Sequence, residues 1–190
     1  MDREILLWIN QHSAPWLDQL FFRSHLMGTL PFCAALVVAT AGWHLRRHEP
    51  RPAAVWVVLG ISTYVVQVTM KAIVDRARPE LWDRLVLTGS SSFPSGHAIA
   101  GATFYPLLAW SLSRFAPRYR VLWWVLGVGF GFFVGFGRLY LGVHWPSDVL
   151  AGWSIGAGQT IMGLTWLARR ERMTVPAPDE GPPGAEEVTT

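Results

Sequence analysis

The chain has 190 residues, of which 51% are hydrophobic and 15% charged, and its formal net charge is +3. Disordered chains combine low hydrophobicity with high net charge, so this composition excludes a disordered chain. Soluble domains carry roughly 25% charged residues, so the composition also argues against a soluble globular protein. Fifteen of the sixteen basic residues are Arg, in short clusters between long apolar runs, which argues against a nucleic-acid-binding protein. Cys33 is the one cysteine, so no disulfide framework and no cysteine-based metal site is expected. The chain is predicted to be a small polytopic membrane protein.

The first predicted element is an interfacial helix over residues 1–22. The four residues that open the chain carry no net positive charge and the apolar run Ile5–Ile9 is short, unlike a secretory signal. Pro15 interrupts the segment, and Trp8 and Trp16 suit the level of the lipid headgroups. A sixth short or re-entrant span is the alternative.

Five stretches without Asp, Glu, Lys or Arg then follow, each long enough to supply the roughly 20 residues of a membrane-spanning helix. The predicted fold class is therefore all-α, a bundle of five transmembrane helices within a membrane-embedded domain of residues 1–172. The tail 173–190, with four Pro and four acidic residues, is expected to be disordered. The five helices are predicted near residues 26–44, 53–72, 95–113, 120–138 and 147–168.

The charges divide unequally between the two ends of such a bundle. The segments 46–51, 114–120 and 169–172 hold nine Arg against two Glu, a net charge of +7, whereas the other end sums to zero. The positive-inside rule puts the Arg-rich segments and the C-terminus in the cytoplasm. The other end is expected to face the periplasm or cell exterior, with the protein in the plasma (inner) membrane.

The outer end of the second predicted span carries Lys71 and Arg78, followed by Pro79. The two cations are seven residues apart, about two helical turns, which predicts that they lie on one helix face before Pro79 stops the helix. Anchoring of a helix end at the headgroups is the simpler reading of such a pair.

The third predicted span opens with Ser95, Gly96 and His97. Ser95 is a favourable N-cap, and Gly96 would let a ligand approach the backbone closely. The N-terminus of a helix offers free N–H groups and the positive end of the helix dipole, which suits an anion. A capped helix with an ordinary interfacial His is the simpler reading.

The connection before the last predicted span holds Arg138, His144 and Asp148. His144 and Asp148 are four residues apart, so the carboxylate could fix the tautomer of the imidazole and leave its other nitrogen as a base or nucleophile. Pro146 is well placed to begin the helix. An ordinary His–Asp contact at the headgroup boundary is the simpler reading.

A functional interpretation of the three segments is favoured because all three are predicted at the same end of the bundle. Several cations and a helix N-terminus favour an anionic ligand, and two histidines suit paired roles in attack and protonation. The combination predicts phosphate-ester chemistry at the outer membrane face.

The three segments resemble the three signatures of the type 2 phosphatidic acid phosphatase (PAP2) superfamily of membrane lipid phosphatases, in order and separation. There are two departures: Gly137 stands where the family usually has Ser, and the first helix of the common six-helix form is not evident. The chain resembles shorter bacterial members that begin with a surface helix, including some undecaprenyl-diphosphate phosphatases. The matching segments are Lys71-x6-Arg78-Pro79, Pro94-Ser95-Gly96-His97 and Arg138-x5-His144-x3-Asp148.

The resemblance implies that His144 attacks phosphorus to form a phosphohistidine, that Asp148 orients it, and that His97 protonates the leaving oxygen. It implies neither a metal nor another cofactor. The substrate would be a lipid phosphate or diphosphate within the bilayer, such as undecaprenyl diphosphate, phosphatidylglycerophosphate or phosphatidic acid. The phosphate oxygens would be held by Lys71, Arg78, Ser95, Gly96 and Arg138.

Two other functions stay open on the sequence: a lipid phosphotransferase that uses the same intermediate, and a non-catalytic lipid-binding membrane protein. The quaternary structure is also open. Glycines at four-residue spacing favour close helix packing within the chain, with a homodimer as the alternative. They are Gly127, Gly131 and Gly135, and then Gly152 and Gly156.

Overall fold

The computed structural model describes residues 1–82, 86, 89 and 91–173, and all regular elements in these residues are helical. The predicted all-α class is therefore confirmed for this part of the chain. The predicted tail lies outside it, except for Met173, which ends the last helix. The elements are α1 (Asp2–Gln11), α2 (Pro15–Leu26), α3 (Leu30–Arg46), α4 (Pro50–Val74), α5 (Gly96–Phe115), the 3₁₀ helix η1 (Pro117–Tyr119), α6 (Arg120–Tyr140) and α7 (Pro146–Met173).

Helices α3 to α7 lie where five helices were predicted, with ends that differ by a few residues. By length and apolar composition, α4 and the segment Pro117–Tyr140 can each cross a membrane. Helices α2 and α3 qualify only together, as a pair bent by 55°. The described residues thus hold two or three candidate spans, and the count of five stays a prediction.

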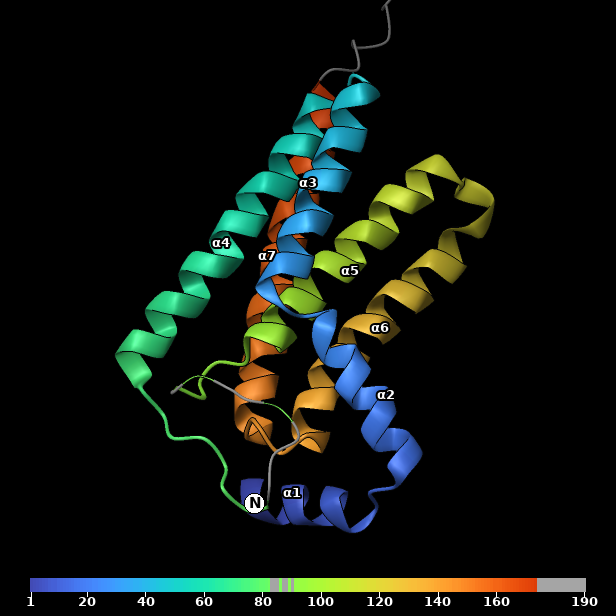
Figure 1. Cartoon of the computed structure of the whole chain (residues 1–190). Coiled ribbons are helices and arrows are strands. Elements are labelled where there is room, and N and C mark those ends of the chain that lie inside the picture. The colour runs from blue at the N-terminus through green and yellow to red at the C-terminus, as the bar shows by residue number, and fades with distance from the viewer. Residues whose placement is uncertain (83–85, 87–88, 90, 174–190) are drawn as a thin grey trace, which may run out of the picture.

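The N-terminal segment forms two helices, because Pro15 begins α2. In Figure 1, α1 crosses one end of the bundle and α2 rises from it toward α3. Helix α2 packs on α6: the Phe21 ring lies 4.5 Å from that of Tyr140, centroid to centroid, and the Tyr140 hydroxyl donates to Asp18 at 2.6 Å. Helix α2 also ends at Leu26, four residues beyond the predicted boundary. The interfacial placement of residues 1–22 stays a prediction.

Helix α5 is the central helix: 12 of its 20 residues are buried, and it packs mainly against α6 and α7 and also against α3 and α4. Glycine allows the close approach: a Cβ atom built on Gly131 would come within 2.5 Å of the Gly101 carbonyl oxygen, and one on Gly156 within 2.4 Å of that of Ile99. The glycines at four-residue spacing therefore serve packing within the chain, as predicted. The homodimer is not tested by these contacts.

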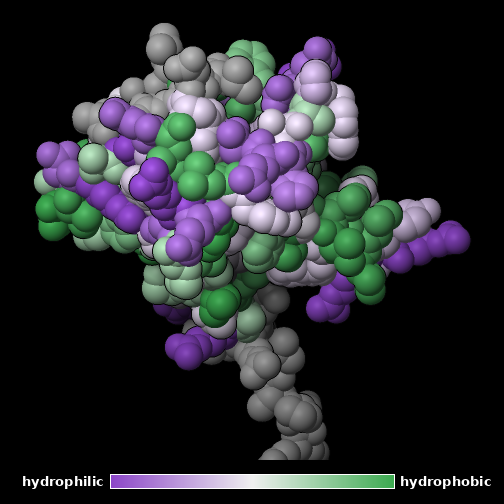
Figure 2. Space-filling view, turned by 90° about the horizontal axis from the view of Figure 1, so that it is seen from below, coloured by the Kyte–Doolittle hydropathy of each residue, from purple (hydrophilic) through white to green (hydrophobic). Residues whose placement is uncertain are grey.

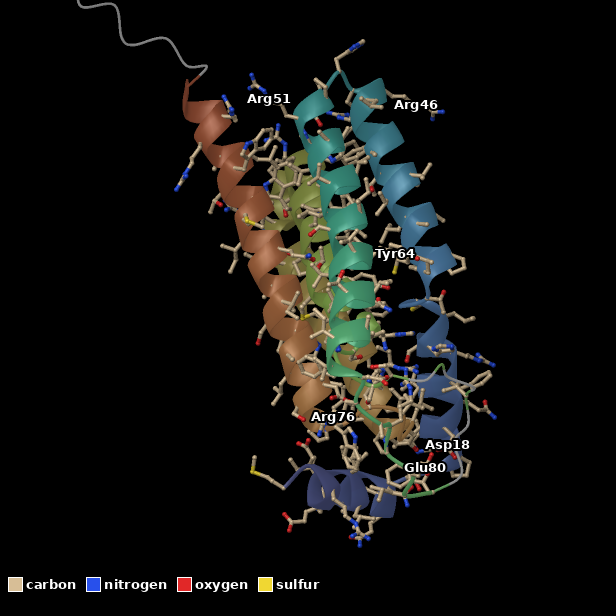
Figure 3. The ribbon with its side chains drawn as sticks, turned by 90° about the vertical axis from the view of Figure 1, so that its left-hand side faces the viewer. Asp18, Arg46, Arg51, Tyr64, Arg76 and Glu80 are labelled. Carbon is tan, nitrogen blue, oxygen red and sulfur yellow. The ribbon has the colours of Figure 1, made fainter. Side chains whose placement is uncertain are left out.

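The two ends of the bundle differ in their charged residues, and α1 lies across one of them. Figure 3 shows Arg46 and Arg51 at one end and Asp18, Arg76 and Glu80 at the other, which is the predicted division of the segments. The second end also carries α1, and hydrophilic side chains gather on its face (Figure 2). All three sequence motifs lie toward this end.

Candidate active site

Lys71 lies in the last turn of α4, but Arg78 does not follow it on the same helix. The helix ends at Val74, because Asp75 turns out of it in the left-handed conformation with φ of 38°. The predictions of one shared helix face and of a stop at Pro79 were therefore wrong. The two cations still converge, since Lys71 Nζ and Arg78 Nη2 donate to the carbonyl oxygen of Ser91 at 2.7 and 3.0 Å.

Arg78 connects the loop before α5 with the loop that carries His144. Its Nε donates to the Gly89 carbonyl at 2.8 Å and its Nη1 to the Val143 carbonyl at 2.7 Å. The same Nη1 lies 3.2 Å from Nε2 of His144. The first and third motifs are thus in direct contact.

Helix α5 begins with the N-cap that the sequence predicts. Ser95 is the N-cap and accepts from the backbone N–H of Ala98 at 3.4 Å, while its own N–H donates to the carbonyl of Asp148 at 3.1 Å. The second of these bonds ties the start of α5 to that of α7. The space beside Gly96 is taken by a side chain, because a Cβ there would lie 2.3 Å from Oε1 of Gln67.

His97 is held by α2, an element that none of the motifs includes. Its ring stacks on that of His25, with 4.9 Å between centroids and 16° between planes. Its Nε2 lies 3.0 Å from both the carbonyl oxygen and Nδ1 of His25. The second predicted histidine of the site therefore contacts a third.

Arg138 lies in the last turn of α6 and is 2% exposed. Its Nη1 donates to Nδ1 of His25 at 2.8 Å, and its Nε has no hydrogen-bond partner in the described part of the chain. Beside it, Gly137 faces α2, where an added Cβ would lie 3.0 Å from both Phe21 Cδ1 and Ser24 Oγ. The replacement of the family serine by Gly137 thus coincides with the close approach of α2.

His144 and Asp148 meet as the sequence predicts, although more loosely than a hydrogen bond. His144 Nδ1 lies 3.6 Å from Asp148 Oδ2, and Pro146 begins α7 between them. The shorter contacts of Asp148 come from the Ser92 hydroxyl at 2.5 Å and from Nη1 of Arg76 at 2.6 Å. Nδ1 of His144 faces this carboxylate, which leaves Nε2 on the side of Arg78.

His144 belongs to the loop between α6 and α7 and is almost completely buried. The pKa of its imidazole is lowered to about 4, mainly because of burial and also because of the positive charges of Arg78 and Arg138, whereas the Asp148 carboxylate opposes the shift. At neutral pH the imidazole is therefore uncharged, which is the state that can act as a nucleophile.

Arg76, Ser92 and His25 contact the predicted site residues without having been predicted. Arg76 pairs with Asp148 and, through Nη2 at 3.0 Å, with Asp2 of α1, so the first helix is tied to the site. Arg76 has a sequence signal, since it is a second Arg two residues from Arg78 at the end whose charges sum to zero. Ser92 and His25 have none, because only the folded chain brings them to their partners.

A cavity of about 660 Å³ joins these groups to an apolar cleft. At one end it is lined by Lys71, Arg78 and His144, with His25, His97 and Arg138 beside them. From there it continues between α3, α4 and α5, where the lining is mostly apolar and includes Cys33, Val37, Ile61, Tyr64 and Phe104. Figure 3 shows Tyr64 midway along the bundle, far from the polar end where Arg76 lies. The described residues contain no group of three or more His, Cys, Asp and Glu arranged to hold a metal ion.

Fold and site together define a class of protein, a helical membrane protein whose cationic, histidine-bearing site opens into an apolar cleft. The PAP2 superfamily matches residues 51–172, more than half of the chain, and the chain belongs to this superfamily. Its enzyme class is that of a phosphatase, as in the relatives described next.

Two relatives and one solved structure illustrate the likeness. Phosphatidylglycerophosphatase B of Bacillus subtilis is 32% identical over 75% of this chain and 71% of its own. An undecaprenyl-diphosphatase of Sulfolobus acidocaldarius is 41% identical, over 35% of this chain and 29% of its own. The crystal structure of a transmembrane PAP2-type phosphatidylglycerolphosphate phosphatase from Bacillus subtilis superposes with a TM-score of 0.81 at 27% identity, covering 88% of this chain and 85% of that one.

Proposed function

We propose that the protein hydrolyses a lipid phosphate or diphosphate at the outer membrane face through a phosphohistidine intermediate. The cavity is the observation that carries this proposal, because its polar end holds the cations and histidines while its apolar part can hold a hydrocarbon chain. The names of the relatives, a phosphatidylglycerophosphatase and an undecaprenyl-diphosphatase, support a substrate of this class.

The first chemical step transfers the phosphoryl group to the protein. Nε2 of His144 attacks phosphorus, the bond from phosphorus to the leaving oxygen breaks, and His97 donates a proton to that oxygen. Asp148 holds the imidazole with Nδ1 turned toward the carboxylate. The negative charge that develops on the phosphate oxygens is stabilised by fixed donors, which is where most of the rate enhancement of phosphoryl transfer arises. These donors are Lys71, Arg78, Arg138, the Ser95 hydroxyl and the Gly96 N–H.

The second step restores the enzyme. His97, which has given up its proton, takes one from water, and the hydroxide attacks the phosphohistidine. The phosphorus–nitrogen bond breaks, inorganic phosphate leaves and His144 is neutral again. An alcohol in place of water would give a phosphotransferase, which is the alternative function.

Release of free phosphate by the purified protein tests the function directly. With no acceptor other than water, we expect inorganic phosphate from at least one of undecaprenyl diphosphate, phosphatidylglycerophosphate and phosphatidic acid. Phosphate that appears only on an added lipid or sugar alcohol would indicate the transferase instead. If the protein neither releases nor transfers phosphate from any of the three lipids, the proposal is wrong.

The Arg-rich end faces the cytoplasm in this proposal, and the site faces the periplasm or cell exterior. Cysteine labelling tests the orientation in a Cys33→Ala background. Ala77 is exposed next to the site, and Arg118 is exposed at the opposite end. We expect an impermeant thiol reagent to label Ala77→Cys in intact cells and Arg118→Cys only after lysis. The reverse pattern would put the site in the cytoplasm.

A further inference from the structure

His25 lies in the last turn of α2, just before the bend into α3, and belongs to none of the three motifs. Its Nδ1 lies 2.8 Å from Nη1 of Arg138. A guanidinium only donates hydrogen bonds, so Nδ1 must be the acceptor and the proton of the neutral ring must be on Nε2. That Nε2 has no hydrogen-bond partner in the described part of the chain, and His25 lines the cavity. His25 therefore offers an N–H donor to a ligand.

The position of His25 relative to His97 is fixed by packing. The two rings stack, and the His25 carbonyl lies 3.0 Å from Nε2 of His97. The following turn is equally close, because a Cβ atom on Gly28 would lie 2.2 Å from Cδ2 of His97. Only glycine allows the turn to approach the histidine this closely. The end of α2 is thus held directly against the proposed proton donor.

The residues that line the cavity indicate where His25 lies between its polar end and its apolar part. His144 and the cations lie at the polar end, and His97 and His25 lie beside them. Along the chain, the lining passes from His25 at the end of α2 through Thr29 and Leu30 into α3, whose lining residues are mostly apolar. In a diphosphate, the phosphate that stays on the lipid lies between the leaving oxygen and the hydrocarbon chain. His25 lies at the corresponding point, next to the group that protonates the leaving oxygen.

We propose that His25 is a specificity-determining residue that binds the phosphate remaining on the lipid when the substrate is a diphosphate. The inference rests on the proposed function, and specifically on His97 as the proton donor. A lipid monophosphate has no second phosphate, so it loses nothing from the absence of this donor. His25 thereby favours a lipid diphosphate over the monophosphate with the same chain.

The test compares kcat/KM for a polyprenyl diphosphate and for the polyprenyl monophosphate with the same chain. His25→Phe keeps a stacked ring without either nitrogen, and His25→Gln keeps an amide N–H donor without the ring. A hydrogen bond to a charged group corresponds to about a tenfold to hundredfold change. We expect His25→Phe to lower the ratio of the two constants by about this factor and His25→Gln to retain most of it. His12→Ala, at the exposed histidine that follows α1, is the matched control.

Activity on the monophosphate reports in the same sample whether each variant is folded. An equal loss on both substrates in His25→Phe would mean that His25 acts only through His97 and Arg138, and would overturn the inference. A wild-type protein that hydrolyses the monophosphate but not the diphosphate would overturn it as well, while leaving the proposed function intact. A wild-type protein that hydrolyses neither lipid, nor any other lipid phosphate, would refute both.

Discussion

Replacement of His144 by alanine is expected to abolish phosphate release from every lipid that the wild-type protein hydrolyses. The imidazole is the proposed nucleophile, and alanine offers no nitrogen with which to form the phosphorus–nitrogen bond. Its pKa of about 4 keeps it uncharged at neutral pH, so the reactive form is almost fully populated in the wild type. Removal of a covalent nucleophile lowers kcat by on the order of 10⁴-fold or more. The measurement is the rate at which inorganic phosphate is released.

The control is His12→Ala, which removes an exposed ring bonded only within α1, to the Trp8 carbonyl, and should leave activity unchanged. The intermediate can be sought separately by rapid quenching with labelled substrate. The wild type should carry label that survives base and is lost in acid, and His144→Ala should carry none. Near-wild-type turnover in His144→Ala would refute the covalent mechanism.

The helices were predictable because the bilayer imposes a simple rule on the sequence. A charge-free run of about 20 residues can be recognised without any knowledge of tertiary contacts, and α3 to α7 lie at such runs. The end of α4 was not predictable in this way. The helix stops at Asp75, a residue in the left-handed conformation, four residues before the proline that was expected to end it. Asp75 adopts a backbone geometry that the helical pattern around it does not signal.

The convergence of the candidate site residues was predictable where these residues are concentrated in short motifs. The structure brings Arg78, His97, Arg138 and His144 to one cavity from segments far apart in the chain. The motifs do not contain the residues that hold them in place. His25 reaches the site only because α2 bends into α3, and Asp2 reaches Arg76 only because α1 crosses the end of the bundle. Neither residue has a spacing relationship to its partner that periodicity could detect.

Arg138→Met should lose most activity without loss of stability. In the described part of the chain no carboxylate lies within ion-pair distance of the buried Arg138 side chain, and its Nε has no partner. A buried cation without a counter-ion is unfavourable, so replacement by an apolar side chain of similar length should leave the unfolding temperature unchanged or raised. Loss of one donor to the transition-state phosphate lowers kcat by about 10²–10³-fold.

Arg118→Met, an exposed arginine at the opposite end, is the matched control and should change neither quantity. Arg138→Lys adds a test of geometry, because lysine keeps the charge but lacks the planar set of donors, and it should recover only part of the activity. The combination of lower activity and undiminished stability would identify Arg138 as a residue whose charge is compensated by the substrate phosphate. A fall in unfolding temperature that accompanies the fall in activity would instead assign it to the packing of α2 against α6.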